Sequence, residues 1–183
     1  MSKIISLAFL RPSKDSKFIN RMTGKLSRHN VFHVELYFDS INQCFSIQYG
    51  EKACLRYKNL ANPLYEIVSF LVSVQQYENC LQFCRNVSES NVVFDNRGMY
   101  MSLFNMGCVG QSSKELGKTF CSKIITEALQ HAQIGEFMEC NPSLTTPSML
   151  MDVSLVHTRR ICSSVPFKCN AMISHGVMKN VIT

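Results

Sequence analysis

The chain lacks any long apolar run and any block of like charge. No stretch approaches the roughly 18 apolar residues that a membrane-spanning helix needs. The apolar run at residues 4–10 is too short for a secretory signal, and no small-residue cleavage site follows it. The formal net charge is +6, spread over the chain with short basic clusters at Arg21–Arg28 and Arg159–Arg160. These features predict a cytoplasmic protein with a mildly basic, solvated surface.

The nine cysteines also lack the spacing of a metal site. No Cys-x-x-Cys pair occurs, and Cys80 and Cys84 are four residues apart, which places both on one face of a helix. Without an export signal, and with an odd number of cysteines, reduced thiols are expected. We therefore predict no metal site, and most of these cysteines should be small core residues.

The composition is 46% hydrophobic and 17% charged over 183 residues, which fits one packed domain. Periodicity predicts strands at 4–9, 32–38, 44–49 and 65–74, and helices at 18–26, 76–87, after Thr119 and before Met151. Strands cluster early and helices late, which predicts an α+β fold. We expect a domain over residues 1–152, an exposed loop at 107–117, and a C-terminal extension, 153–183, packed on the same domain.

Cys121 stands out because it follows Thr119, a good helix cap, in the first turn of the most amphipathic predicted helix. Unpaired N–H groups and the positive end of the helix dipole favour a thiolate there. Gly135 is predicted to end this helix. By position alone, Cys121 could equally be one more buried helix cysteine.

A base for such a thiol would be an imidazole held by a third polar group. Of the five histidines, His33 is best placed, because residues 32–38 alternate and put His33 on the polar side with Glu35 and Tyr37. Asp39–Asn42 supplies a turn, so the next strand should pair with this one as a hairpin. Ser46 and Gln48 on that strand are then the candidates for the third group.

Four segments carry a family resemblance. They are His33-Val34-Glu35-Leu36-Tyr37-Phe38, Phe94-Asp95-Asn96-Arg97-Gly98-Met99-Tyr100, Phe120-Cys121-Ser122-Lys123-Ile124-Ile125 and Thr145-Thr146-Pro147-Ser148-Met149-Leu150. In this order they resemble the permuted branch of the NlpC-type papain-like superfamily, which includes lecithin:retinol acyltransferase relatives and a poxviral member. Those chains place the histidine before the nucleophilic cysteine. The resemblance covers about residues 4–151.

The resemblance implies a circularly permuted papain-like fold, in which an antiparallel sheet packs against the helix that carries the cysteine. It implies Cys121 as nucleophile and His33 as base, with Ser46 or Gln48 as the third residue. The family commonly has His, Asn, Gln or Glu as third residue, so Ser46 would orient the histidine poorly: either Gln48 substitutes for it or catalysis is weak. The family usually has a small residue at the position of Glu35. Glu35, Tyr37 and Phe120 are the candidates for substrate contact.

The implied activity is that of a cysteine hydrolase (amidase, peptidase, or ester or thioester hydrolase) or an acyltransferase that works through an acyl-enzyme. No metal or organic cofactor is required, and peptides, amides and lipid acyl groups are all open as substrates. The competing interpretation is an inactive interaction module on the same scaffold, viral and acting in the host cytoplasm. A nucleic-acid partner is not expected, since the only interleaved aromatic and basic residues are Tyr49, Lys52, Arg56 and Tyr57. Peripheral membrane contact and the oligomeric state stay open.

Overall fold

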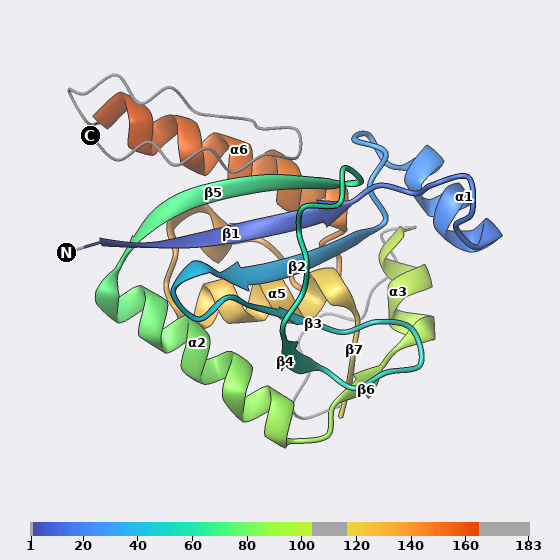
Figure 1. The fold of residues 1–183 in the computed structure, drawn as a ribbon, viewed down its shortest axis with the longest axis horizontal. Helices are drawn as coiled ribbons and strands as arrows, with labels where there is room; N and C mark the ends of the chain where they lie inside the picture. The colour runs from blue at the N-terminus through green and yellow to red at the C-terminus, as the bar shows by residue number, and fades with distance from the viewer. Residues whose placement is uncertain (1, 104–116, 165–183) are drawn as a thin grey trace.

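The computed structural model describes residues 2–103 and 117–164 (Figure 1). The elements are β1 (Ser2–Leu10), α1 (Phe18–Leu26), β2 (His33–Phe38), η1 (Asp39–Ile41), β3 (Gln43–Ser46), β4 (Cys54–Arg56), β5 (Tyr65–Ser73), α2 (Val74–Glu89), β6 (Val93–Phe94), α3 (Asn96–Leu103), β7 (Lys118–Thr119), α5 (Cys121–His131), η2 (Gly135–Glu139) and α6 (Pro147–Ser164). The predicted loop at 107–116 and the end of the predicted extension after residue 164 lie outside the described residues.

The main sheet has the strand order β4-β3-β2-β1-β5, and all of its neighbours are antiparallel. β2 and β3 form the predicted hairpin, with Leu36 opposite Phe45 and Phe38 opposite Gln43. The predicted α+β class with an antiparallel sheet is therefore confirmed.

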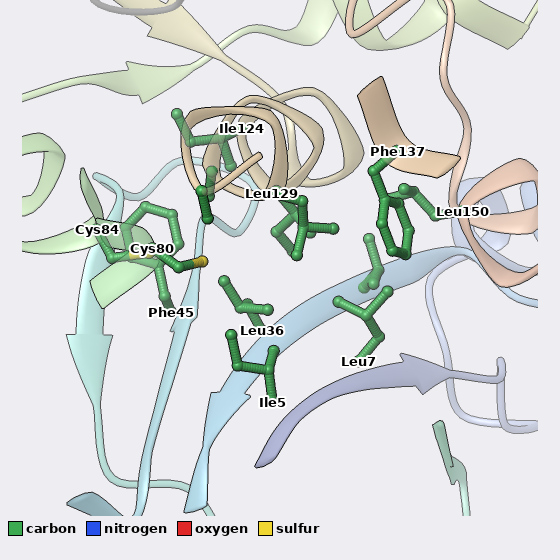
Figure 2. Close-up of a cluster of buried hydrophobic side chains, with 14 of the residues drawn as sticks. Ile5, Leu7, Leu36, Phe45, Cys80, Cys84, Ile124, Leu129, Phe137 and Leu150 are labelled. Atoms are coloured by element: carbon green, nitrogen blue, oxygen red, sulfur yellow. The ribbon is translucent and has the colours of Figure 1, made fainter. Parts of the chain in front are cut away.

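The core lies between one face of this sheet and the helices α2, α5 and α6 (Figure 1). Alternate residues of β1 and β2, such as Leu7 and Leu36, point from the sheet toward α5 and meet Ile124 and Leu129 (Figure 2). Phe137 from η2 closes the same cluster. Because strand side chains alternate between faces, the residues between these apolar ones point the other way. Glu35 and Tyr37 belong to that second set.

The segment that joins β4 to β5 crosses the sheet on the side away from α5 (Figure 1). This segment contains Lys58, which forms an ion pair with the carboxylate of Glu35. As a result every residue of β2 is buried, polar ones included. A charged group on β2 therefore needs partners within the protein.

Two predicted helix boundaries are wrong. Thr119 does not cap α5, because the parallel pairing of β7 with β6 holds it in an extended strand opposite Phe94, and Phe120 is the N-cap. Gly135 does not end α5, which stops at His131; Gly135 begins η2 instead. α6 is also longer than the short helix predicted, and it runs without a break across residues 152 and 153.

Candidate active site

Cys121 is the first residue of α5. The first hydrogen bond of this helix runs from the Ile124 N–H to the Phe120 carbonyl, at 3.1 Å. The N–H groups of Cys121 and Ser122 therefore have no helical carbonyl four residues before them to bind. With the positive end of the helix dipole, this favours negative charge at the Cys121 sulfur.

His33, the first residue of β2, is the hydrogen-bonding and charge partner of the Cys121 thiol. Its Nε2 atom lies 3.0 Å from Oε1 of Glu35, two residues further along the same strand. A protonated ring donates this hydrogen bond to the carboxylate. Because Nε2 binds Glu35, Nδ1 is the ring nitrogen that remains for a hydrogen bond with the Cys121 thiol.

The charges of this group favour a protonated His33. Burial disfavours the imidazolium, but the charge and hydrogen bonding of Cys121 and Glu35 outweigh it and raise the pKa of His33 to about 9. Burial likewise disfavours the Glu35 carboxylate, but His33 and Lys58 outweigh it and lower the pKa of Glu35 to about 2. The ring is thus a cation at neutral pH, hydrogen-bonded to the Glu35 carboxylate and in contact with Cys121.

Cys44, on the neighbouring strand, is a second buried cysteine beside Glu35. Burial, together with the Glu35 carboxylate, raises the pKa of the Cys44 thiol to about 12. Cys44 therefore stays a neutral thiol, although it also lies beside Glu35. What distinguishes Cys121 is its contact with the imidazolium of His33.

A pocket of about 520 Å³ contains both Cys121 and His33 in its wall. The other lining residues are Leu10, Lys17, Ile19, Asn20, Phe32, Gln48, Tyr49, Phe94, Met99 and Tyr100. Most of these side chains are apolar or aromatic, with three polar ones among them. Such a lining suits an apolar group with a few polar anchors.

The other residues expected in the site lie in different places. Gln48 lines the pocket with Cys121 and His33. Ser46 is buried, and its hydroxyl accepts a hydrogen bond from Nη2 of Arg56 at 3.4 Å. The group hydrogen-bonded to His33 is Glu35, on its own strand, rather than Ser46 on the partner strand.

The three residues expected to contact substrate are all buried, and the pocket wall contains none of them. Glu35 is covered by Lys58 and binds His33. Tyr37 donates its hydroxyl to Oδ1 of Asn42 at 3.1 Å. Phe120 is the N-cap of α5. Their positions suit support of the site rather than contact with a ligand.

The remaining two segments of the sequence resemblance also meet near Cys121. Asp95 accepts a hydrogen bond from the Gly98 N–H at 2.9 Å and so caps the start of α3, which brings Met99 and Tyr100 to the pocket. Ser122 donates its hydroxyl to the Thr145 carbonyl at 2.7 Å, which ties the start of α5 to the turn before α6.

Sequence reasoning missed Lys58 and the wall formed by Lys17, Ile19 and Asn20. Lys58 lies in an irregular segment with no periodic pattern, so nothing in the sequence pairs it with Glu35. The helical spacing around Phe18 predicted α1 but did not indicate which residues of it would line a pocket.

No helix within residues 2–103 and 117–164 has the length and apolar character to cross a membrane. In the same residues, no three His, Cys, Asp or Glu side chains group as metal ligands would. Comparison with known proteins gave no match to a family model, to a curated protein or to a solved structure.

Proposed function

We propose that this chain is a cysteine hydrolase or acyltransferase of the permuted papain-like type, with Cys121 as nucleophile and His33 as general acid and base. The observation that carries the proposal is the buried array of Cys121, His33 and Glu35, in which Cys121 and His33 line an apolar pocket and Glu35 lies behind His33. Each member has a separate role: the thiol reacts, the imidazole moves the proton, and the carboxylate holds the imidazole.

In the first step the Cys121 thiolate attacks the acyl carbon of an ester, thioester or amide, and a carbon–sulfur bond forms. The bond to the leaving group breaks, and the leaving atom takes the proton from His33. An acyl-enzyme and a neutral imidazole remain. Water or another acceptor then attacks the acyl carbon, gives its proton to His33, and releases the Cys121 sulfur.

The raised pKa of His33 suits both steps. Before the reaction the negative charge on Cys121 keeps the proton on the ring. Once the sulfur is acylated that charge is gone, so the pKa of His33 falls and the ring becomes ready to accept the proton of the incoming water. Glu35 keeps its charge throughout, which fixes the orientation of the ring in both steps.

Two groups are candidates to stabilise the oxyanion. The Cys121 N–H lies at the start of α5, where no helical carbonyl binds it, and Gln48 lines the pocket with an amide that can donate. This gives Gln48 a substrate-stabilising role, while Glu35 is the residue that orients His33.

The pocket supports an acyl group with an apolar or aromatic part. Phe32, Phe94 and Tyr100 line it, and Lys17 lies 5.4 Å from the centre of the Tyr49 ring. Peptide, simple amide and lipid acyl substrates all contain such a group, so we propose the class as apolar acyl compounds without choosing among the three.

The order of the motifs supports the permuted papain-like assignment. The histidine strand precedes the cysteine helix, the sheet is antiparallel, and all four segments of the resemblance contact the start of α5 or the pocket.

The experiment that tests this proposal detects the covalent acyl-enzyme by mass spectrometry. The protein is mixed with nitrophenyl esters of increasing acyl length, and the intact mass is followed with peptide mapping. We expect an acyl group on Cys121, its loss in Cys121→Ala, and unchanged acylation in the matched control Cys54→Ala. Random acylation spread over several cysteines, equal in Cys121→Ala, would contradict the proposal and leave the non-catalytic interaction module.

A further inference from the structure

α1 carries its apolar side chains on the outside of the protein. Phe18, Met22 and Leu26 follow at intervals of four residues, so they share one face of the helix. They are 68%, 41% and 71% exposed, respectively. In an ordinary surface helix an apolar stripe such as the one formed by these three residues would face the core. Figure 1 shows α1 at the end of the sheet, away from the packed helices.

The inward face of α1 is small and polar, and it is fitted closely to the domain. Thr23 and Gly24 are the buried residues of this helix. A Cβ atom added to Gly24 would lie 2.7 Å from Cγ of Pro12, so the backbone approaches Pro12 too closely for any other residue. The helix therefore cannot turn its apolar stripe inward without breaking this contact.

The same segment carries most of the net charge of the chain. Residues 11–29 contain six Lys and Arg and one acidic residue, Asp15, which gives +5 of the total of +6. The exposed cations are Lys14, Lys17, Arg21, Lys25 and Arg28. At about 100° per residue, Lys25 projects beside Phe18 and Arg21 lies next to Lys25. Cations thus flank the apolar stripe on the exposed side.

We propose that α1 docks on an anionic lipid bilayer, with Phe18, Met22 and Leu26 in the interface and the cations on the headgroups. An exposed apolar stripe bordered by Lys and Arg is the pattern of helices that lie in the membrane surface. The cations alone would suit any polyanion in water. The apolar stripe favours the bilayer over a nucleic acid, because burying apolar side chains lowers the free energy only where water is excluded.

Docking would bring the bilayer beside the pocket. Lys17, Ile19 and Asn20 of this region line the pocket wall, and the exposed ring of Tyr49 lies there too. An acyl chain leaving the bilayer would then have a short path to Cys121. This consequence rests on the proposed function; the docking of α1 does not.

The test is flotation of the full chain with phosphatidylcholine vesicles, with and without phosphatidylserine. We expect binding only with phosphatidylserine, weakened by salt. The double variant Phe18→Ser, Leu26→Ser should abolish it, and Lys25→Gln should weaken it about fivefold, the factor for one cation near an anionic surface. Controls are Met149→Ser with Val156→Ser, an exposed apolar pair on α6, and Lys118→Gln.

Two results would overturn the proposal. One is no binding to the phosphatidylserine vesicles at low salt. The other is binding that the double variant of α1 does not reduce, together with equal binding to a soluble polyanion such as heparin, which would assign the face to a partner in water. Cys121→Ala should still bind vesicles, so a failure of catalysis and a failure of docking give different results.

Discussion

Nε2 of His33 lies 3.0 Å from Oε1 of Glu35, two residues along the same buried strand. Because side chains at i and i+2 share one face of a strand, no second element has to deliver the group that orients the ring. Lys58 binds the same oxygen of Glu35. The ring of His33 is thereby fixed by its own strand, which leaves its other nitrogen for Cys121.

The protonation of His33 tests this arrangement directly. In the wild-type protein the ring should titrate near pH 9. Glu35→Gln and Cys121→Ala should each lower that pKa, since each removes a partner that raises it. In the double variant neither partner opposes burial, and the pKa should fall below the ordinary 6.5. The measurement is an NMR titration of the imidazole Cε1–H signals.

Ser46→Ala is the matched control for this titration, because Ser46 is equally buried but hydrogen-bonded to Arg56. It should leave the His33 titration unchanged. A shift in Ser46→Ala as large as that in Glu35→Gln would show that the orienting group had been assigned wrongly.

Removal of the Glu35 carboxylate should also destabilise the fold. Glu35→Ala leaves the buried His33 and the half-buried Lys58 without their shared anion, and we expect a loss of about 3 kcal/mol in the free energy of unfolding. Glu78→Ala removes the exposed pair with Lys3 and should cost about 0–1 kcal/mol. Urea unfolding of the two variants measures both, and equal losses would contradict the role of Glu35.

The stability of the fold should depend on pH in two ranges. The pKa of His33 is raised from 6.5 to about 9, so the folded state holds the proton more tightly, and this stability is lost as pH rises through 9. The pKa of Glu35 is lowered from 4.5 to about 2, so its contribution is lost as pH falls through 2. We expect the greatest contribution between 4.5 and 6.5.

Urea unfolding across pH measures this profile. In His33→Gln the free energy of unfolding should fall much less between pH 6.5 and 9. The loss of stability at acid pH should remain but be smaller, since Lys58 still stabilises the Glu35 carboxylate. An alkaline fall of the same size in His33→Gln would mean that another group causes it.

Gly98 should tolerate no larger residue. A Cβ atom there would lie 2.4 Å from Oδ2 of Asp95, the side chain that accepts the Gly98 N–H. Gly98→Ala should therefore break this cap at a cost of about 1 kcal/mol and shift Met99 and Tyr100 at the pocket. Asp95→Ala should cost a similar amount. Because both variants remove one contact, the double variant should cost much less than the sum of the two single losses.

The local pattern of the sequence predicts a large part of this structure. Alternation at His33–Phe38 indicates which side chains share a face, and the turn at Asp39–Asn42 predicts the β2–β3 hairpin. Cys121 falls in the first turn of its helix as expected. These features depend on neighbours a few residues away in the sequence, so the local periodicity is enough to predict them.

The parts that escaped prediction depend on distant contacts. The pairing of β7 with β6 keeps Thr119 out of α5, although Thr119 is by itself a good cap. Lys58 meets Glu35 only because an irregular segment crosses the sheet. The spacing of Phe18, Met22 and Leu26 predicts a helix but does not indicate that its apolar side faces outward.

The most direct test of the Cys121–His33 pair is alkylation of the native protein with iodoacetamide, followed by peptide mapping at neutral pH. Cys121 is only 4% exposed, whereas Cys54 and Cys140 are more accessible. We expect that Cys121 nevertheless reacts first, and that His33→Ala slows the alkylation of Cys121 while Cys54 and Cys140 keep their rates. Labelling that follows exposure, with Cys121 last and indifferent to His33→Ala, would contradict it.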